Sequence, residues 1–277
     1  SLLISCQHLD VSQRLGEHAM SALTSLARRE DAGAHSLLAS EASTVLARMF
    51  VNNEARSLLS REMIGNALET MGHLIEHRTS RHAVVAVHNT IPFFVSTVLS
   101  ARDEGVQKAA GWILVSLAVD PELGFHVIAE GGLVGLAVYA SSEGGRQQEE
   151  AAWAFANLSS QKQNAEPLMS DVKVLETLIA ILKRAKNDRS MSENNPKACL
   201  QAIWTIANLA VHDHLRRSLA DRGSIEELNR QLQVWLDPST NGEPTEDMNE
   251  SRESVAALLR QALRALANLA AERTNRA

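Results

Sequence analysis

Two histidines and a glutamate in this chain have the spacing of a zinc site. Residues 73–77 read His-Leu-Ile-Glu-His, the H-x-x-E-H pattern in which some peptidases bind zinc with two imidazoles one helical turn apart. However, Leu74 and Ile75 fit the apolar stripe of a predicted helix, and no third ligand accompanies the histidines. We therefore expect His73 and His77 to be solvated residues near a helix end, with no metal and no cofactor.

Two further clusters contain residue types that occur in active sites and cofactor sites. His212-Asp213-His214 joins two predicted helices without a nucleophile motif, so loop polarity and helix capping account for it. A dinucleotide-binding loop must follow a strand, and Gly131, Gly132 and Gly135 follow none, so we expect turn residues there. Neither cluster supplies catalytic residues, and the sequence predicts that the protein is not an enzyme.

The composition favours an all-helical protein. Of the 277 residues, 45% are hydrophobic but only 4% are aromatic, which provides a core while lacking the residues that favour sheets. Six prolines and 14 glycines leave long uninterrupted stretches of Ala, Leu, Glu and Arg, which lose little conformational freedom in a helix. We expect no strands.

The net charge and the cysteine spacing limit which partners and which cellular compartment are expected. A formal net charge of -6 argues against nucleic acid, whose binding needs a dense basic face. Cys6 and Cys199 lie far apart without CxxC spacing, so they indicate neither a disulfide framework nor a zinc site. A reducing intracellular compartment, cytoplasmic or nuclear, is the prediction. Apolar stretches such as 111–119 are shorter than the ~20 residues of a membrane span.

One phrase recurs along the chain and divides it into repeats. It reads GWILVSLA, AWAFANLS, IWTIANLA and, more faintly, LRALANLA, at residues 111–118, 152–159, 203–210 and 263–270. The first interval matches a helical repeat of roughly 40 residues, and the later two are longer. Polar, turn-rich inserts at 186–196 and 237–251 explain the extra length as surface loops before the recurring phrase.

Each repeat is predicted to contain three helices, the third carrying the phrase. Asp120 is expected to cap the first helix, with Pro121 at its first position. Turn residues then separate the first and second helices at 88–89, 131–132, 170–171 and 222–224. Before residue 65 the intervals are too short for three helices, and we expect irregular two-helix units.

The repeats resemble those of the armadillo family over about residues 65 to 272. This resemblance implies an all-α fold, a right-handed superhelix of three-helix repeats with a concave binding face. The predicted organisation is irregular N-terminal helices over 1–64 and armadillo repeats over 65–277. A single domain is expected. Because no polar capping repeat follows the last helix, we expect it to be part of a longer chain or to have its end covered by a partner.

A second feature of the phrase is a Trp four residues before an Asn, which places both side chains on one helix face. In the importin-α branch of the armadillo family, similar Asn amides bond the main chain of an extended peptide while Trp faces pack its side chains. The resemblance therefore implies a ladder of partner-binding residues: Trp112, Ser116, Trp153, Asn157, Trp204, Asn208, Arg264 and Asn268. Ser116 replaces one Asn and Arg264 one Trp, and Lys108 would disfavour a basic partner.

A structural alternative for the ladder stays open: the Asn residues could bond loop carbonyls of the adjacent repeat, and the Trp residues could belong to the core. The preferred function is a protein-protein interaction scaffold or adaptor that holds extended or helical segments of partner proteins, within a larger complex or alone. Two other functions remain: a regulatory or autoinhibitory domain of a larger enzyme, or a structural subunit of a large assembly.

Overall fold

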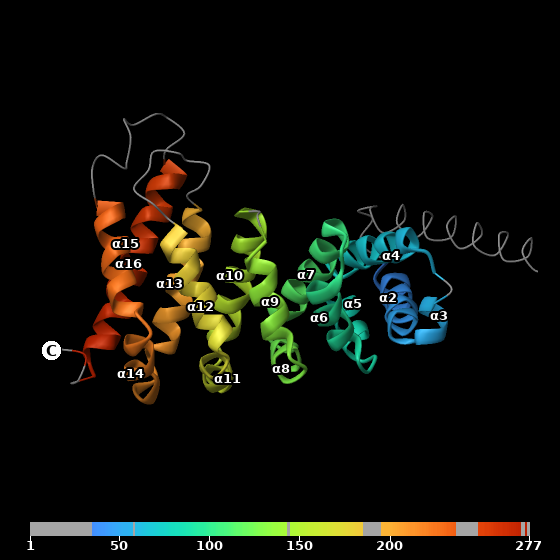
Figure 1. The fold of residues 1–277 in the computed structure, drawn as a ribbon, viewed down its shortest axis with the longest axis horizontal. Helices are drawn as coiled ribbons and strands as arrows, with labels where there is room; N and C mark the ends of the chain where they lie inside the picture. The colour runs from blue at the N-terminus through green and yellow to red at the C-terminus, as the bar shows by residue number, and fades with distance from the viewer. Residues whose placement is uncertain are drawn as a thin grey trace, which may run out of the picture. The chain divides into compact units, whose positions relative to one another are not determined.

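The computed structural model describes residues 35–57, 59–142, 145–184, 195–236, 249–272 and 275. Within these ranges every element is a helix, as the composition predicts (Figure 1). Contacts divide the chain into two compact units. The first comprises the described residues up to Leu117 together with Ala129–Gly135, and the second comprises Ala118–Ile128 together with the described residues from Leu136 onward. Helical repeats contact mainly their neighbours, so a chain of them can form two units where one continuous domain is expected.

The first unit contains five complete helices and nearly all of a sixth, α7. They are α2 (His35–Val51), α3 (Asn53–Ser57), α4 (Arg61–Leu74), α5 (Arg78–Val85), α6 (Thr90–Ser100) and α7 (Glu104–Ala118). Helix α2 packs against α4, α5 and α6. Between α2 and α6, the rings of Phe50 and Phe93 stack at 5.0 Å and Phe94 meets both edge-on. The predicted boundary between residues 64 and 65 falls inside α4.

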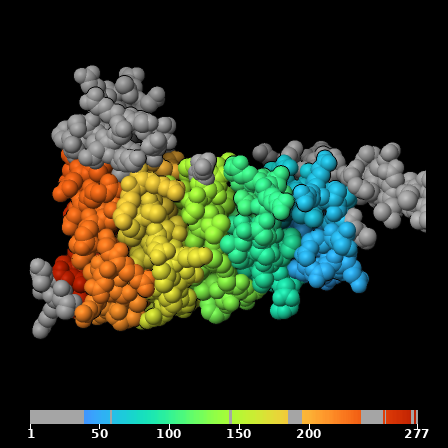
Figure 2. Space-filling view, viewed as in Figure 1, coloured from blue at the N-terminus to red at the C-terminus, as the bar shows by residue number. Residues whose placement is uncertain are grey.

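The second unit repeats a pattern of a short, a medium and a long helix. The long helices are α10 (Gly145–Ser159), α13 (Pro196–Leu209) and α16 (Asn249–Ala270). Helix α10 packs against α13, and α13 against α16. In the space-filling view, the parts of the second unit drawn in yellow and in orange lie against each other without a visible gap (Figure 2). The remaining elements are η1 (Lys162–Asn164), α11 (Ala165–Ser170), α12 (Val172–Arg184), α14 (Asp213–Asp221) and α15 (Ser224–Leu236). Helices α8 (Gly124–Ala129) and α9 (Gly132–Ala140) contain residues of both units.

The predicted turns between the first and second helices are confirmed. Asn89, Gly131 and Gly223 have φ of 67°, 80° and 86°, and they are the described residues with left-handed backbone. Glycine and asparagine adopt this conformation at the lowest steric cost. The fourth turn uses Asp171 instead, in extended conformation, with Oδ1 accepting a hydrogen bond from the Lys173 amide at 3.0 Å.

The predicted start of α8 is wrong by a few residues. Helix α8 begins at Gly124, and Pro121 lies in the turn before it. The buried Asp120 side chain accepts a hydrogen bond from the Glu122 amide at 3.0 Å, while its carbonyl accepts from the Leu123 and Gly124 amides. Asp120 therefore stabilises a tight turn, and the helix starts only after that turn closes.

The two predicted inserts end earlier than expected. Helix α13 already begins at Pro196, and α16 already begins at Asn249; most of the remaining insert residues lie outside the described ranges. Asn195 explains the first boundary, because its Oδ1 accepts a hydrogen bond from the Ala198 amide at 3.0 Å and so caps α13. Its Nδ2 donates to the Gly145 carbonyl at 2.6 Å, which ties the start of α13 to the start of α10.

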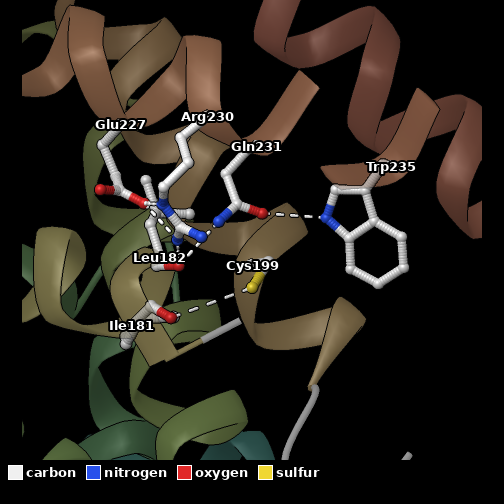
Figure 3. Close-up of polar contacts among 7 residues, drawn as sticks. All are labelled: Ile181, Leu182, Cys199, Glu227, Arg230, Gln231 and Trp235. Atoms are coloured by element: carbon white, nitrogen blue, oxygen red, sulfur yellow. Dashed lines mark hydrogen bonds and ion pairs between the residues drawn. The ribbon is translucent and has the colours of Figure 1, made fainter. Parts of the chain in front are cut away.

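A polar network fixes α15 to the end of α12 (Figure 3). Gln231 Nε2 donates to the Leu182 carbonyl at 2.7 Å, and its Oε1 accepts from Trp235 Nε1 at 2.9 Å. Arg230 donates to the same carbonyl and pairs with Glu227. A helix leaves its last carbonyls without intrahelical partners, and these side chains satisfy one of them. These hydrogen bonds compensate the cost of burying the side chains of Glu227 and Gln231.

No single helix of the described ranges has the length and apolar composition needed to cross a membrane. Helices α5 and α6 reach that length and composition only when taken together, and they are bent by 92° relative to each other. Val84, Ile91, Phe94 and Val98 of this pair are buried in the first unit.

Candidate functional site

The predicted ladder residues of the second unit lie on three long helices that pack side by side, α10, α13 and α16 (Figure 1). On α10 and α13, a Trp and an Asn four residues apart share one helix face. On α16 the same positions hold Arg and Asn. We call this the ladder surface, made up of Trp153, Asn157, Trp204, Asn208, Arg264 and Asn268.

Both tryptophans of the ladder surface reach solvent. Trp153 and Trp204 are each 40% exposed, while the residues on either side of them are fully buried. Residues such as Phe155 and Ile206 supply the core from the opposite side of the same helices. An indole of this size is normally largely covered in a folded protein. The two indoles therefore form exposed apolar surface one repeat apart.

The three asparagine amides are partly engaged. Asn157 Nδ2 donates to the Trp153 carbonyl of its own helix at 2.8 Å. Asn208 Nδ2 donates to Ser159 Oγ on α10 at 3.1 Å, and Asn268 Nδ2 donates to the Ala207 carbonyl on α13 at 3.4 Å. Two of the three thus bond the preceding repeat, Asn208 through a serine hydroxyl and Asn268 through a carbonyl inside a helix, so neither bonds a loop carbonyl.

These bonds leave most of the hydrogen-bonding capacity of the amides unused. A carboxamide has two N–H donors and an oxygen with two acceptor positions, and each of the three asparagines uses one donor. No group in the described part of the chain donates to the Oδ1 of Asn157, Asn208 or Asn268. All three side chains are half-buried. Each can still accept one hydrogen bond and donate another.

Arg264 occupies the register of the tryptophans on α16. Its side chain is exposed, and Nη1 donates to Gln261 Oε1 at 3.3 Å. On α16 the recurring phrase therefore presents a guanidinium at the position where α10 and α13 present indoles. A guanidinium keeps a flat face for stacking but adds a permanent positive charge.

Trp112 and Ser116 lie in the first unit. Trp112 is half-buried on α7 and packs beside α4, where a Cβ added to Gly72 would lie 3.6 Å from its ring. Ser116 is only 7% exposed, and its hydroxyl donates to the Trp112 carbonyl at 2.9 Å. Their role in partner binding stays a prediction. Lys108 on the same helix pairs with Glu104 at 2.6 Å, which neutralises its charge.

The H-x-x-E-H pattern was expected to lie within one helix, but the structure divides it between α4 and α5. Helix α4 ends at Leu74, and His77 occupies the N-cap position of α5 in extended conformation. The two histidines therefore lack the one-turn spacing that a pair of zinc ligands on one helix requires. Within the described ranges, no group of three or more His, Cys, Asp and Glu side chains is placed to hold a metal ion.

The other two clusters have structural roles. His214 Nε2 lies 2.6 Å from Glu166 Oε1, and Asp213 opens α14 and pairs with Arg216. Gly131 is a turn residue as predicted. Gly135 is not: it lies inside α9, where an added Cβ would come within 2.8 Å of Leu114 Cδ1. Close packing between helices, which the sequence pattern does not reveal, explains this glycine.

A hydrogen-bonded cluster near the start of α10 is not evident from the sequence. Tyr139 donates to Glu150 Oε2 at 2.5 Å, and Arg146 Nε donates to Glu150 Oε1 at 2.7 Å. Burial raises the pKa of Tyr139, and the hydrogen bond to the Glu150 carboxylate raises it further. The four-residue spacing of Arg146 and Glu150 signals their ion pair, whereas the contact with Tyr139 depends on the tertiary fold.

Comparisons with known proteins agree with this architecture. No protein-family model matches the sequence, and no curated protein matches it. Among solved structures, a computationally designed armadillo repeat protein made for modular peptide recognition is 18% identical, with a TM-score of 0.67 over 92% of this chain and 97% of that one. This chain has an armadillo repeat fold.

Two further designed armadillo repeat proteins support the same assignment. One, solved in complex with the peptide (KR)4, is 20% identical, with a TM-score of 0.64 over 89% of this chain and 92% of that chain. The other is 18% identical, with a TM-score of 0.62 over 90% and 92% of the two chains. The predicted all-α solenoid of three-helix armadillo repeats is thereby confirmed.

Proposed function

We propose that this chain is a protein-protein interaction scaffold that binds an extended segment of a partner protein on the ladder surface and performs no chemistry of its own. The observation that carries the proposal is the pair of exposed indoles, Trp153 and Trp204, beside amides with unused hydrogen-bonding capacity. Exposed aromatic residues in such a setting are frequent sources of binding energy.

An extended segment suits this surface for a geometric reason. Packed helices lie about 8–10 Å apart, and an extended chain advances about 3.3 Å per residue, so two or three residues span one repeat. Every residue of an extended segment exposes an N–H and a carbonyl. The free Oδ1 and N–H of Asn157, Asn208 and Asn268 can bond these groups, while Trp153 and Trp204 pack against side chains.

The comparisons are consistent with this proposal, since one structural neighbour was designed for peptide recognition and another holds the peptide (KR)4. Within the proposal the partners are proteins, in the cytoplasm or the nucleus, and nucleic acid is not a ligand. The second unit carries two complete Trp and Asn pairs, on α10 and α13, which give a partner two equivalent contacts in succession.

Binding to an array of random ten-residue peptides tests the proposal. The wild type should retain a subset of peptides, and Trp153→Ala with Trp204→Ala should lose most of that binding while its helical circular dichroism stays intact. Phe125→Ala is the matched control, because Phe125 is an exposed aromatic residue of the same unit that lies on α8 and is not part of the ladder surface. Equal loss in the control, or no loss in the double variant, would reject the ladder surface as the binding site.

A further inference from the structure

The last position of the ladder surface differs in charge from the two before it. Arg264 occupies the register of Trp153 and Trp204, and Arg260 lies one turn earlier on the same helix. Both side chains are exposed. From Val255 to Ala270, helix α16 contains no Asp or Glu. The α16 side of the ladder surface is therefore locally basic, although the chain as a whole carries a net charge of -6.

These two guanidinium groups are not neutralised by the described part of the chain. The hydrogen bond of Arg264 goes to the neutral amide of Gln261, and no carboxylate there pairs with Arg260 or Arg264. Other arginines of the second unit are paired, for example Arg216 with Asp213 at 2.7 Å and Arg146 with Glu150 at 2.7 Å. Two adjacent positive charges on one face repel each other mildly, and a bound anion would remove that repulsion.

A third positive charge lies on the neighbouring helix. Lys197 is exposed near the start of α13, two turns before Trp204 on the same face, and it forms no ion pair with the described residues. Three carboxylates also lie near the ladder surface, and none of them pairs with Arg260, Arg264 or Lys197 in the described part of the chain. Glu150 is bonded to Arg146 and Tyr139 on α10, Glu149 is half-buried one turn before Trp153, and Glu253 lies about two turns before Arg260.

The Asn amides beside these charges favour an extended peptide as the ligand. Asn208 and Asn268 lie one turn after Trp204 and Arg264, and each has an unused Oδ1 and N–H. A main chain bonded to these amides would place one side chain against the Trp204 indole. A side chain two or three residues along would then lie against the Arg264 guanidinium. A guanidinium recognises a carboxylate through two parallel hydrogen bonds.

We infer that the segment bound by the ladder surface is acidic, with Asp or Glu carboxylates received by Arg260 and Arg264 and supported by Lys197. This inference rests on the proposed function and specifies its ligand. It also separates this chain from the structural neighbour that was solved with the basic peptide (KR)4. The same fold would then be used with the opposite charge preference.

The test uses the full chain and three fluorescein-labelled octapeptides, (DE)4, (QN)4 and (KR)4, measured by fluorescence anisotropy at low salt. The wild type should bind (DE)4 at least about tenfold more tightly than (KR)4, and added salt should weaken that binding. Arg260→Glu with Arg264→Glu should remove the preference for (DE)4. Arg217→Glu is the matched control, because Arg217 is an exposed arginine on α14 that is not part of the ladder surface.

Each other outcome separates this inference from the proposed function. Tighter binding of (KR)4 or (QN)4 that is lost in the tryptophan double variant would overturn the acidic preference while leaving the proposed function in place. Preference for (DE)4 that survives the double arginine change would overturn the assignment to Arg260 and Arg264. Binding of a twelve-residue thymidine oligonucleotide more tightly than (DE)4 would assign the basic positions to nucleic acid instead. Loss of both octapeptide and array binding would reject both proposals.

Discussion

Asn208 Nδ2 donates a hydrogen bond to Ser159 Oγ at 3.1 Å and thereby joins the third helices of two consecutive repeats, α13 and α10. Ser159 is 3% exposed, and its own hydroxyl donates to the Ala156 carbonyl at 2.8 Å. One residue of the ladder surface therefore has a structural contact as well as a proposed binding role. Substitution of Asn208 is therefore expected to affect both stability and partner binding.

Removing this contact should lower the free energy of unfolding modestly. Ser159→Ala and Asn208→Ala should each cost about 0.5–1.5 kcal/mol, the usual net value of one hydrogen bond. The double variant should cost less than the two single variants added together, because both remove the same bond. Urea unfolding of the four proteins measures this coupling. Strict additivity would mean that the bond contributes nothing.

A glycine in α8 should tolerate no side chain. A Cβ on Gly124 would lie 2.7 Å from Leu158 Cδ2 and 3.1 Å from the Ala118 carbonyl. Gly124→Ala should therefore lower the free energy of unfolding by about 1–3 kcal/mol, as overpacking does. Gly65→Ala is the control, because its Cβ would meet Val106 at 3.6 Å inside a helix, where alanine is favoured over glycine. Equal midpoints in thermal unfolding for the two variants would contradict this packing.

Tyr139 is the single tyrosine of the chain, so its ionisation can be followed directly. Burial and the hydrogen bond to Glu150 hold the pKa of Tyr139 well above its ordinary value of about 10. The folded state therefore keeps the phenol protonated when the unfolded state would lose the proton. Stability from this group is fully present below about pH 10 and declines as the pH rises above it.

Absorbance at 295 nm during an alkaline titration measures this effect. The tyrosinate signal should appear only when the chain unfolds. In Glu150→Gln, which removes the negative partner, it should appear at lower pH than in the wild type. Tyr139→Phe should show a shallower loss of stability above pH 10. A reversible tyrosinate signal near pH 10 in the folded wild type would exclude the buried hydrogen bond.

Cys199 should be unreactive in the folded protein. Burial raises the pKa of its thiol to about 12, so almost no thiolate forms at neutral pH. In a Cys6→Ser variant, a thiol reagent should label the folded chain at pH 8 far more slowly than the chain in 6 M guanidinium, by about a hundredfold or more. Fast labelling of the folded variant would show that Cys199 is accessible.

The repeat fold could be predicted from local sequence because each repeat contains the same recognisable sequence pattern. The recurring phrase marks the third helices, and Asn89, Gly131 and Gly223 mark three of the turns because few other residues adopt left-handed backbone. Exact helix ends were less predictable. Asp120 closes a turn before α8 rather than capping it, a choice that depends on its burial.

The sequence could place the Trp and Asn residues of the ladder on a common helix face, but it could not predict their contacts. Spacing alone puts Trp204 and Asn208 together, whereas the bond from Asn208 to Ser159 joins residues 49 positions apart. The low exposure of Ser116 and the packing of Gly135 against Leu114 likewise depend on which helices become neighbours. These contacts follow from tertiary packing, which one helical pattern does not encode.

The most direct test of partner binding on the ladder surface follows the four indole N–H signals in a nitrogen-proton correlation spectrum. A peptide selected from the array is added to the labelled full chain, and each signal is assigned by replacing one tryptophan. The signals of Trp153 and Trp204 should shift on binding. The signal of Trp235, which lies on α15, is not part of the ladder surface and donates to Gln231 at 2.9 Å, should stay in place. Shifts at Trp235 with none at Trp153 and Trp204 would contradict binding on the ladder surface.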